Sequence, residues 1–408
     1  MDAFATIGQP AATAVVRAML ATHVPHAVLL VGPASVGKEP LAMDIAAALL
    51  CTGATGTDRP CRACRGCRMV EHGNHPDLHR LEPEGAGAQI RIGDRLHPEP
   101  GSVRGLAVEL SLLPVEGGAR VAIVRDAQRM NDDAQSALLK TLEEPPAGTT
   151  LILCADDEER LLPTVRSRCA RIRLGPVGVR EIERLLAQRE LADPPTAARL
   201  ARLAAGRAGL AVSYAMAPEA EAIRGEIGRI LLDLVPATRA ARLRSARELI
   251  ARAGSLAAAE SPRAAPPTAS PARRGRAAAR TSEAAAAITT APEPAATSAD
   301  ADGAGESSAE AEPERKASAA ERRRALGVLL DVWRGLARDL ALAELGAVQS
   351  IRDVALLEEL AATASTPAPG AFAAFLGRLA RAGELLDANV SPELVLDVLL
   401  VRWPRPSR

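Results

Sequence analysis

The sequence predicts an α/β domain built on a parallel sheet, followed by all-helical domains. An apolar, strand-like run at Ala27–Val31 directly precedes a phosphate-loop pattern and then a helically spaced stretch. Two more apolar runs, Val121–Val124 and Thr150–Cys154, are separated by a helix around Asp132–Glu144. Alternating strands and helices are typical of parallel sheets covered by helices on both faces. From about Val179 onward, leucine and isoleucine recur at helical spacing only.

Composition limits the class of protein. The chain has 408 residues, enough for two or three domains, and its 50 basic and 50 acidic residues create no global field toward nucleic acid or membrane. No apolar run approaches the roughly 20 residues of a membrane-spanning helix. The first residues lack the basic and apolar regions of a signal peptide. We therefore expect a soluble, cytoplasmic protein with no membrane partner.

The phosphate loop is incomplete. The full pattern is G-x-x-x-x-G-K-[ST], in which the hydroxyl group binds Mg²⁺. The residues that match it are Gly32, Gly37 and Lys38, but Glu39 replaces the Ser/Thr. We expect a degenerate site in which ATP binding is weak or absent. Lys38 either binds phosphate weakly or forms an ion pair with Glu39 or Asp126 in a vacant site, and we favour the vacant site.

A cluster of four cysteines follows the first predicted helix. They are spaced C-x9-C-x2-C-x2-C, at Cys51, Cys61, Cys64 and Cys67. Four thiolates at such spacing can surround Zn²⁺ tetrahedrally, and a closed shell of four protein ligands indicates a structural site. Disulfides are a poor alternative in a cytoplasmic chain. Three nearby histidines are then not needed as ligands, and we interpret them as surface residues: His72, His75 and His79.

Residues 256–322 differ from the rest of the chain. Ala, Pro, Ser, Thr and Glu dominate, with a basic first half and an acidic second half. Such a segment cannot bury enough apolar surface to offset the entropy of ordering it, so we predict a disordered linker. A DNA contact by its basic half is the less favoured alternative. Beyond it lie four helical stretches: Ala325–Leu345, Asp353–Ala362, Ala371–Asp387 and Glu393–Trp403.

The ordered set of motifs resembles a known family. The motifs are the cysteine cluster, Ser136–Pro146 (SALLKTLEEPP), Ser167-Arg168-Cys169 and Leu386–Val395. Together they resemble bacterial DNA polymerase III clamp-loader subunits of the AAA+ superfamily, specifically the delta-prime subunits. The resemblance covers nearly the whole chain apart from the linker. It implies a RecA-like AAA+ domain at 1–175 with a zinc module at about 51–80, a helical lid at 176–218, and a helical collar for oligomerisation at 219–255 and 323–408.

The resemblance also separates ATP-hydrolysing motor subunits from the non-hydrolysing delta-prime subunits. Besides Glu39, the differences from a motor are Arg125 and Asp126 in the Walker B motif, Ala155 and Asp156 at the sensor-1 position, and Gly209 at the position of a phosphate-sensing Arg. Arg125 stands where the Mg²⁺-linked Asp of a motor would be. We therefore expect no intrinsic ATPase activity, and any DNA polymerase activity would belong to the whole holoenzyme.

The resemblance gives Arg168 a role outside its own subunit. In this family that Arg acts in trans as an arginine finger at a neighbouring motor subunit's ATP site, and its planar, permanent charge suits this role. The expected function is a non-hydrolysing stator of the clamp loader in DNA replication. The implied partners are gamma/tau motor subunits and the delta subunit, and indirectly the sliding clamp and primer-template DNA.

Two other functions compete with the stator. An ATP-hydrolysing gamma/tau-like motor predicts Thr at position 39, where the sequence has Glu. A zinc-dependent DNA-binding module predicts a basic face around the cysteines, where four arginines do occur: Arg59, Arg62, Arg65 and Arg68. We interpret these arginines as a solvated surface or a subunit contact.

Overall fold

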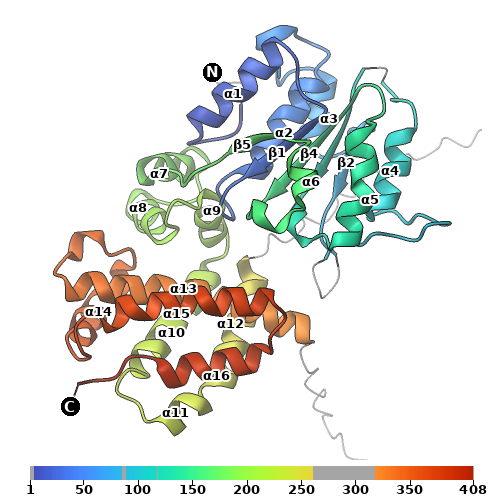
Figure 1. Ribbon diagram of the computed structural model, residues 1–408. Coiled ribbons are helices and arrows are strands. Elements are labelled where there is room, and N and C mark those ends of the chain that lie inside the picture. The colour runs from blue at the N-terminus through green and yellow to red at the C-terminus, as the bar shows by residue number, and fades with distance from the viewer. Residues whose placement is uncertain (1–3, 85–88, 117, 261–317, 408) are drawn as a thin grey trace, which may run out of the picture. The chain divides into compact units, whose positions relative to one another are not determined.

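A computed structural model describes residues 4–84, 89–116, 118–260 and 318–407 (Figure 1). The described chain begins with an α/β domain and continues with helices only. Nothing among the described helices has both the length and the apolar character needed to span a membrane.

The α/β domain contains a five-stranded sheet in the order β2-β3-β4-β1-β5, and all its strand pairs are parallel. The strands are β1 (Ala27–Val31), β2 (Leu78–Leu81), β3 (Arg120–Val124), β4 (Thr149–Ala155) and β5 (Ala170–Arg173). The predicted parallel sheet is confirmed, and the three predicted strands are its central ones. The two edge strands were not predicted.

Helices cover both faces of the sheet, as Figure 1 shows. One face packs on α1 (Pro10–Ala21), α2 (Lys38–Leu49) and α3 (Arg65–Glu71); the other packs on α4 (Val103–Ser111), α5 (Asp132–Glu143) and α6 (Pro163–Arg166). Along β1, Val28 and Leu30 face the first layer, while Ala27 and Leu29 face the second. Successive side chains point to opposite faces of a strand, so a strand that is buried on both sides must be apolar throughout.

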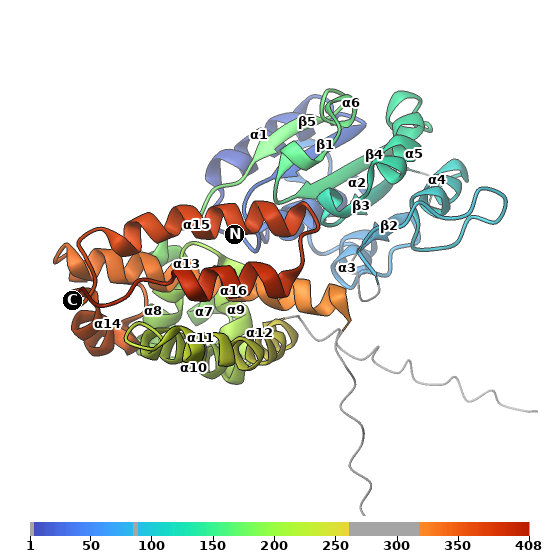
Figure 2. The same cartoon turned by 60° about the horizontal axis from the view of Figure 1, so that its bottom comes forward.

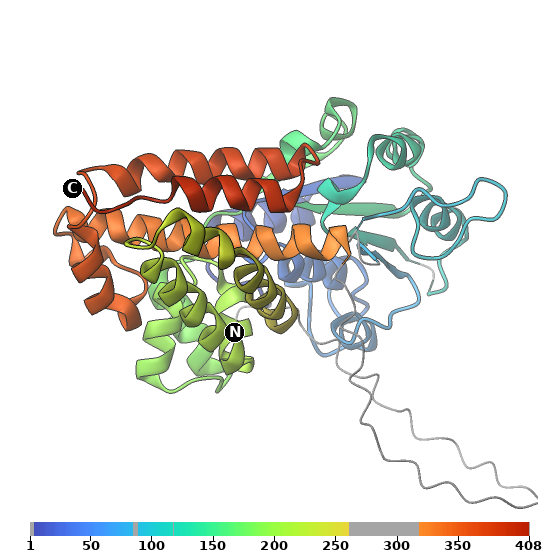
Figure 3. The same cartoon turned by 90° about the horizontal axis from the view of Figure 1, so that it is seen from below.

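The remaining helices share one hydrophobic cluster. They are α7 (Val179–Gln188), α8 (Pro194–Leu203), α9 (Ala208–Met216), α10 (Pro218–Asp233), α11 (Arg239–Arg244), α12 (Ala246–Glu260), α13 (Ala319–Glu344), α14 (Leu357–Ala364), α15 (Ala371–Asp387) and α16 (Pro392–Arg402). Helices α13, α15 and α16 lie alongside one another in Figures 2 and 3. The all-helical part predicted beyond Val179 is confirmed.

A buried arginine holds the C-terminal helices together. The Arg242 guanidinium, which is fully buried, donates to four backbone carbonyls, including those of Val235 at 2.7 Å and Pro404 at 2.9 Å. Two of the other acceptors, Leu400 and Trp403, lie at the end of α16. The guanidinium therefore supplies donors to carbonyls that the end of a helix leaves without intrahelical partners.

The boundaries expected for the linker fall inside helices. Helix α12 runs on to Glu260, and α13 begins at Ala319 after a capping box formed by Ser318 and Glu321. The expected linker ends at 256 and 322 are therefore wrong by several residues on each side. Residues 261–317, which include the rest of the predicted linker, lie outside the described residues.

Candidate functional site

The phosphate loop joins β1 to α2 with a backbone that requires glycine at two positions. Gly37 has φ +108°, a left-handed conformation that side chains disfavour, and it caps the start of α2. A Cβ atom added to Gly32 would lie 2.3 Å from the carbonyl oxygen of Leu174. The predicted strand–loop–helix context is therefore confirmed, and the loop keeps the backbone of a phosphate-binding loop.

The Lys38 ammonium group binds within its own domain. The side chain is 8% exposed, and Nζ lies 2.6 Å from the carbonyl oxygen of Gly32, 2.7 Å from that of Pro33 and 2.6 Å from Oδ1 of Asp156. An ammonium group has three hydrogens to donate, so these three acceptors satisfy it. Lys38 is thus part of an internal ion pair, as one of the two interpretations expected.

Its partner is not one of the two residues named from the sequence. Asp156 follows the end of β4, whereas Asp126 occupies a left-handed turn after β3. Because β4 lies next to β1, the residue that follows β4 is the acid that reaches the phosphate loop. The expected pairing of Lys38 with Glu39 or Asp126 is therefore wrong.

Glu39 belongs to a separate group of four charged residues. Its carboxylate lies 2.6 Å from Arg80 and 3.3 Å from Arg125, and both arginines also bind Glu82 at 2.9 and 3.0 Å. The sequence identified Glu39 and Arg125 as the two changed Mg²⁺ positions, and the structure places them in contact. Arg80 and Glu82 were missed because they belong to the unpredicted strand β2 and its end.

Gly209 contacts the phosphate loop directly. It lies in the first turn of α9, and its N–H donates to the carbonyl oxygen of Ser35 at 2.8 Å. A Cβ atom added there would come within 3.2 Å of the Ser35 Cβ. The position expected to carry a phosphate-sensing arginine in a motor is thus too close to the loop for a larger residue without a shift.

The four predicted cysteines come together. The Sγ atoms of Cys51, Cys61, Cys64 and Cys67 all lie within 4.8 Å of one another. Zn–S bonds of about 2.3 Å in a tetrahedron would place sulfur atoms about 3.8 Å apart. Two of the atoms, Sγ of Cys51 and Cys64, are 3.9 Å apart. The cluster therefore fits a four-coordinate metal ion.

Backbone N–H groups favour the thiolate form of Cys64. The Cys64 N–H points at Sγ of Cys61 (3.3 Å), and the Cys67 N–H points at Sγ of Cys64 (3.4 Å), where α3 begins. Burial opposes ionisation of Cys64, but N–H groups of Cys67 and Thr52 outweigh it and lower the pKa of that thiol to about 5. A deprotonated thiol is the form that binds metal.

The histidines near the cluster do not all lie at the surface. His72 is exposed, but His75 is buried, and its Nδ1 accepts a hydrogen bond from the Asp77 N–H at 3.1 Å. His79 lies on β2 of the central sheet, where Nδ1 is 2.9 Å from a carboxylate oxygen of Glu109. The interpretation of His75 as a surface residue is therefore wrong, because it is buried, and His79 belongs to strand β2 and not to the cysteine module.

Three of the four arginines around the cysteines have partners in the protein. Arg62 pairs with the buried carboxylate of Asp44, and Arg65 lies 3.1 Å from Glu116. Nε of Arg59 donates to the carbonyl oxygen of Ala54 at 2.8 Å. These contacts support the interpretation of the group as a protein surface. They do not favour a face built to contact DNA.

Arg168 lies at the edge of the α/β domain, in the turn between α6 and β5. Its side chain is 35% exposed, and its guanidinium lies 2.6 Å from Glu143 and 3.0 Å from the carbonyl oxygen of Thr164. Glu143 ends α5 and is the first Glu of the Glu-Glu-Pro-Pro sequence. Glu143, which was not singled out from the sequence, therefore positions Arg168.

Comparison with known proteins finds similarity along the α/β domain. Residues 8–178 match a family model described as "DNA polymerase III, delta subunit". The chain is 41% identical over 149 residues to DNA polymerase III subunit delta' of Pseudomonas aeruginosa, which covers 35% of this chain and 41% of that protein. The delta' subunit of Bacillus subtilis is 31% identical over 175 residues, which cover 43% of this chain and 49% of that protein. The chain thus spans less than half the length of these relatives.

Tau subunits also match, as do several solved structures. DNA polymerase III subunit tau of Salmonella typhimurium is 31% identical over 198 residues, covering 47% of this chain and 29% of that protein. Among solved structures, a DNA polymerase III gamma subunit-related protein of Thermotoga maritima covers 95% of this chain and 96% of its own at 14% identity and TM-score 0.34. The RuvB branch-migration motor of the same organism covers 52% and 61% at 16% identity and TM-score 0.35. Scores this low do not distinguish among folds, whereas the family model and the delta' relatives agree with each other. Over residues 8–178, this chain is therefore similar to DNA polymerase III delta' subunits.

Proposed function

We propose that this protein is the non-hydrolysing stator subunit of a DNA polymerase III clamp loader. The observation that carries the proposal is the state of the phosphate loop. All three Lys38 hydrogens are used inside the domain, and Glu39 and Arg125 pair with each other where a motor would bind Mg²⁺. Hydrolysis requires Mg²⁺ to neutralise charge on the transferred phosphate, so this chain lacks intrinsic ATPase activity and binds ATP weakly or not at all.

Arg168 is the residue through which the stator acts. It is supplied in trans to the ATP site of a neighbouring gamma/tau motor subunit, where a planar guanidinium stabilises charge on the transferred phosphate. Its partly exposed position supports this role, because the side chain has only to leave Glu143 and the carbonyl oxygen of Thr164. Exposed ion pairs contribute about 0–1 kcal/mol, so release from Glu143 costs little.

The other parts of the chain support assembly. Zn²⁺ bound by the four cysteines would be structural, since four protein ligands leave no open position. The helices from 176 to 218 form a lid, and those at 219–260 and 318–402 form the collar through which the subunit joins the motor and delta subunits. Sliding clamp and primer-template DNA are reached indirectly, through the complex.

The tau relatives make an ATP-hydrolysing motor the second candidate. The stator and the motor are distinguished by measuring Mg²⁺-dependent ATP turnover of the purified full chain. Lys38→Ala is the control for a contaminating ATPase. The stator predicts background turnover in both proteins, and assembly with gamma/tau and delta subunits in size-exclusion chromatography. Turnover that disappears in Lys38→Ala would establish the motor instead, and failure to assemble would overturn the stator.

A restoration experiment sharpens the distinction. Glu39→Thr alone should leave the chain inactive, because Arg125 still repels Mg²⁺ and Lys38 still binds Asp156. Measurable ATPase activity in Glu39→Thr would show that the site is one substitution away from a motor and would contradict the proposed vacant site.

A further inference from the structure

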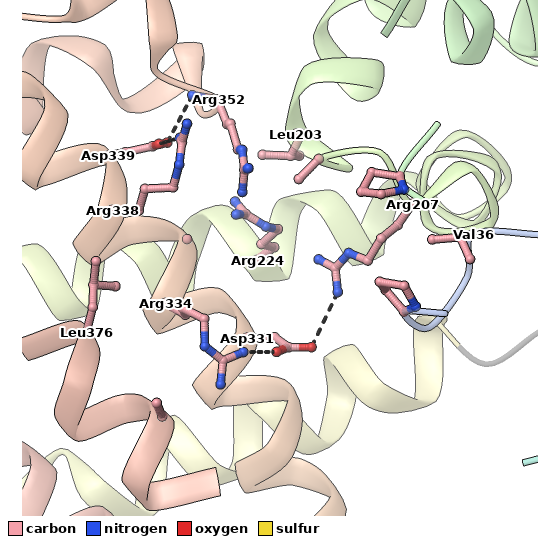
Figure 4. Close-up of a pocket in the computed structure, with 15 residues that line it drawn as sticks. Val36, Leu203, Arg207, Arg224, Asp331, Arg334, Arg338, Asp339, Arg352 and Leu376 are labelled. Atoms are coloured by element: carbon pink, nitrogen blue, oxygen red, sulfur yellow. Dashed lines mark hydrogen bonds and ion pairs between the residues drawn. The ribbon is translucent and has the colours of Figure 1, made fainter. Parts of the chain in front are cut away.

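A cavity of about 460 Å³ opens between the phosphate loop, which contributes Pro33 and Val36, and the helices that follow the sheet (Figure 4). Five of its lining residues are arginines, two of them on α13 and the others from three separate segments: Arg334, Arg338, Arg207, Arg224 and Arg352. The helices that carry the first four belong to one shared hydrophobic cluster, so their backbones are held in place. In Figure 4 the guanidinium groups of Arg224, Arg338 and Arg352 point into the same space.

Three of these arginines pair with two carboxylates. Asp331 serves two of them, at 2.6 Å from Arg334 and 3.3 Å from Arg207. Arg224 lies 2.6 Å from Asp353. One acid shared between two guanidinium groups leaves this side of the cavity with excess positive charge.

The opposite side is less well neutralised. Asp339 lies 2.9 Å from Arg338, but its other oxygen accepts the backbone N–H groups of Arg352 and Asp353 at 3.1 and 3.0 Å. Among the residues that the structure describes, no carboxylate lies within ion-pair distance of the Arg352 guanidinium. Burial and the nearby Arg338 lower the pKa of Arg352, which is the direction expected for a guanidinium among like charges.

The charge balance and the walls indicate the kind of ligand. Five guanidinium groups against the three carboxylates at positions 331, 339 and 353 leave a local charge of +2. Part of the wall is apolar, with Leu203 and Leu376. Cavities of roughly 300–1,000 Å³ with a few convergent polar groups are typical small-molecule sites, and guanidinium forks match phosphate oxygens in pairs.

We propose that this cavity binds a small anion that carries at least two phosphate groups, such as the polyphosphate part of a nucleotide. The proposal is independent of the stator function, because it uses neither Lys38 nor Arg168. An anion of charge −2 or more would neutralise the excess charge and give Arg352 an acceptor. A nucleic-acid backbone needs an extended basic track, and the arginines here converge on one enclosed space.

The test uses inorganic pyrophosphate and the full chain at low ionic strength, with titration calorimetry and thermal unfolding. Arg352→Gln and Arg338→Gln should each weaken pyrophosphate binding roughly tenfold or more, since each removes a charge-assisted hydrogen bond. The matched control is Arg381→Gln, an exposed arginine on α15 that pairs with Glu384 and should bind as the wild type does. Lys38→Ala tests whether pyrophosphate binds to the phosphate loop instead, because Lys38 donates to Pro33, which lines the cavity.

Stability without ligand provides a second readout. If Arg352 only supported the fold, Arg352→Gln would unfold at lower temperature. A binding role predicts an unfolding temperature equal to or above that of the wild type without pyrophosphate, and loss of the increase that pyrophosphate gives the wild type.

Three outcomes would overturn the proposal: no binding to the wild type, equal binding by Arg352→Gln and Arg381→Gln, or binding lost only in Lys38→Ala. Two further arms identify the source of the phosphates. If ADP displaces pyrophosphate from the wild type, and Arg352→Gln weakens ADP binding too, a nucleotide is supported as the natural ligand. A single-stranded oligonucleotide that competes better than either would contradict a small-anion site.

Discussion

Replacing Lys38 with Met tests whether the phosphate loop is closed on itself. The substitution keeps most of the side-chain volume but removes the contacts to Gly32, Pro33 and Asp156. In a phosphate loop that binds nucleotide, removing the lysine would cost the ligand-free protein little stability. In this loop it removes three hydrogen bonds of a nearly buried charge, so the free protein should lose stability.

The magnitude follows from the contacts. A hydrogen bond to a charged group contributes about 1.5–3 kcal/mol. Burial of the ammonium offsets part of the sum, and Asp156 is 36% exposed, so solvent screens the ion pair. We expect a net loss of about 2–4 kcal/mol in the free energy of unfolding of the α/β domain. For a domain of this size, that is a fall of roughly 5–15 °C in Tm.

The assay has to report on the right domain. Both tryptophans, Trp333 and Trp403, lie in the C-terminal helical part, so their fluorescence would not follow the phosphate loop. Calorimetry of the full chain, together with amide exchange in the first turn of α2, reports on it directly. The control is Lys140→Met, at an exposed position on α5.

A double-mutant cycle with Asp156→Asn isolates the ion pair, and we expect a favourable coupling of about 1 kcal/mol. If Lys38→Met is as stable as Lys140→Met, then Lys38 does not stabilise the loop, and the argument for a self-satisfied site is refuted.

Three further changes test other parts of the structure. The double variant Cys61→Ser/Cys64→Ser should lose its bound metal in elemental analysis and unfold at lower temperature, whereas an unchanged metal content would show that these cysteines are not ligands. Arg242→Met should cost about 3–5 kcal/mol in urea unfolding followed by tryptophan fluorescence, because several buried carbonyls lose their donor, and a cost below 1 kcal/mol would contradict this. Gly209→Arg should increase amide exchange in the phosphate loop, since the new side chain must displace Ser35; unchanged exchange would show that the loop accommodates it.

The sequence predicted the central strands because they are apolar on both faces. In β1, β3 and β4, buried residues run without interruption, which gives a pattern that short-range reasoning recognises. The edge strands β2 and β5 read Leu-His-Arg-Leu and Ala-Arg-Ile-Arg. One side of an edge strand meets no neighbouring strand, so charged residues are tolerated there and the pattern is lost.

The candidate site was likewise predicted only in part, where its residues belong to the predicted central strands or follow them. Glu39 and Arg125 were expected to share the metal position, because the phosphate-loop pattern and the resemblance to motor subunits identify them with the two Mg²⁺ positions. Arg80 could not be added while β2 was unknown. The choice of Asp156 over Asp126 as the partner of Lys38 depends on β4 lying next to β1, and strand order is not contained in the local sequence.

The central claim is that this chain acts on its neighbour's ATP and not on its own. The most direct test replaces Arg168 with Ala in a clamp loader reconstituted with gamma/tau and delta subunits. The matched control is Arg166→Ala, two residues away, which removes the same charge from a side chain that pairs with Glu159 at 2.9 Å. Assembly and metal content are measured first and should match the wild type for both variants.

Single-turnover ATP hydrolysis is then followed with clamp and primer-template DNA present. Loss of an arginine finger lowers the rate at the site it serves by roughly 10³–10⁵, although other motor sites reduce the effect on overall turnover. We predict that the Arg168→Ala complex loses one hydrolysis phase while the Arg166→Ala complex retains every phase. A fully assembled Arg168→Ala complex that hydrolyses ATP and loads clamps as the wild type does would contradict the account.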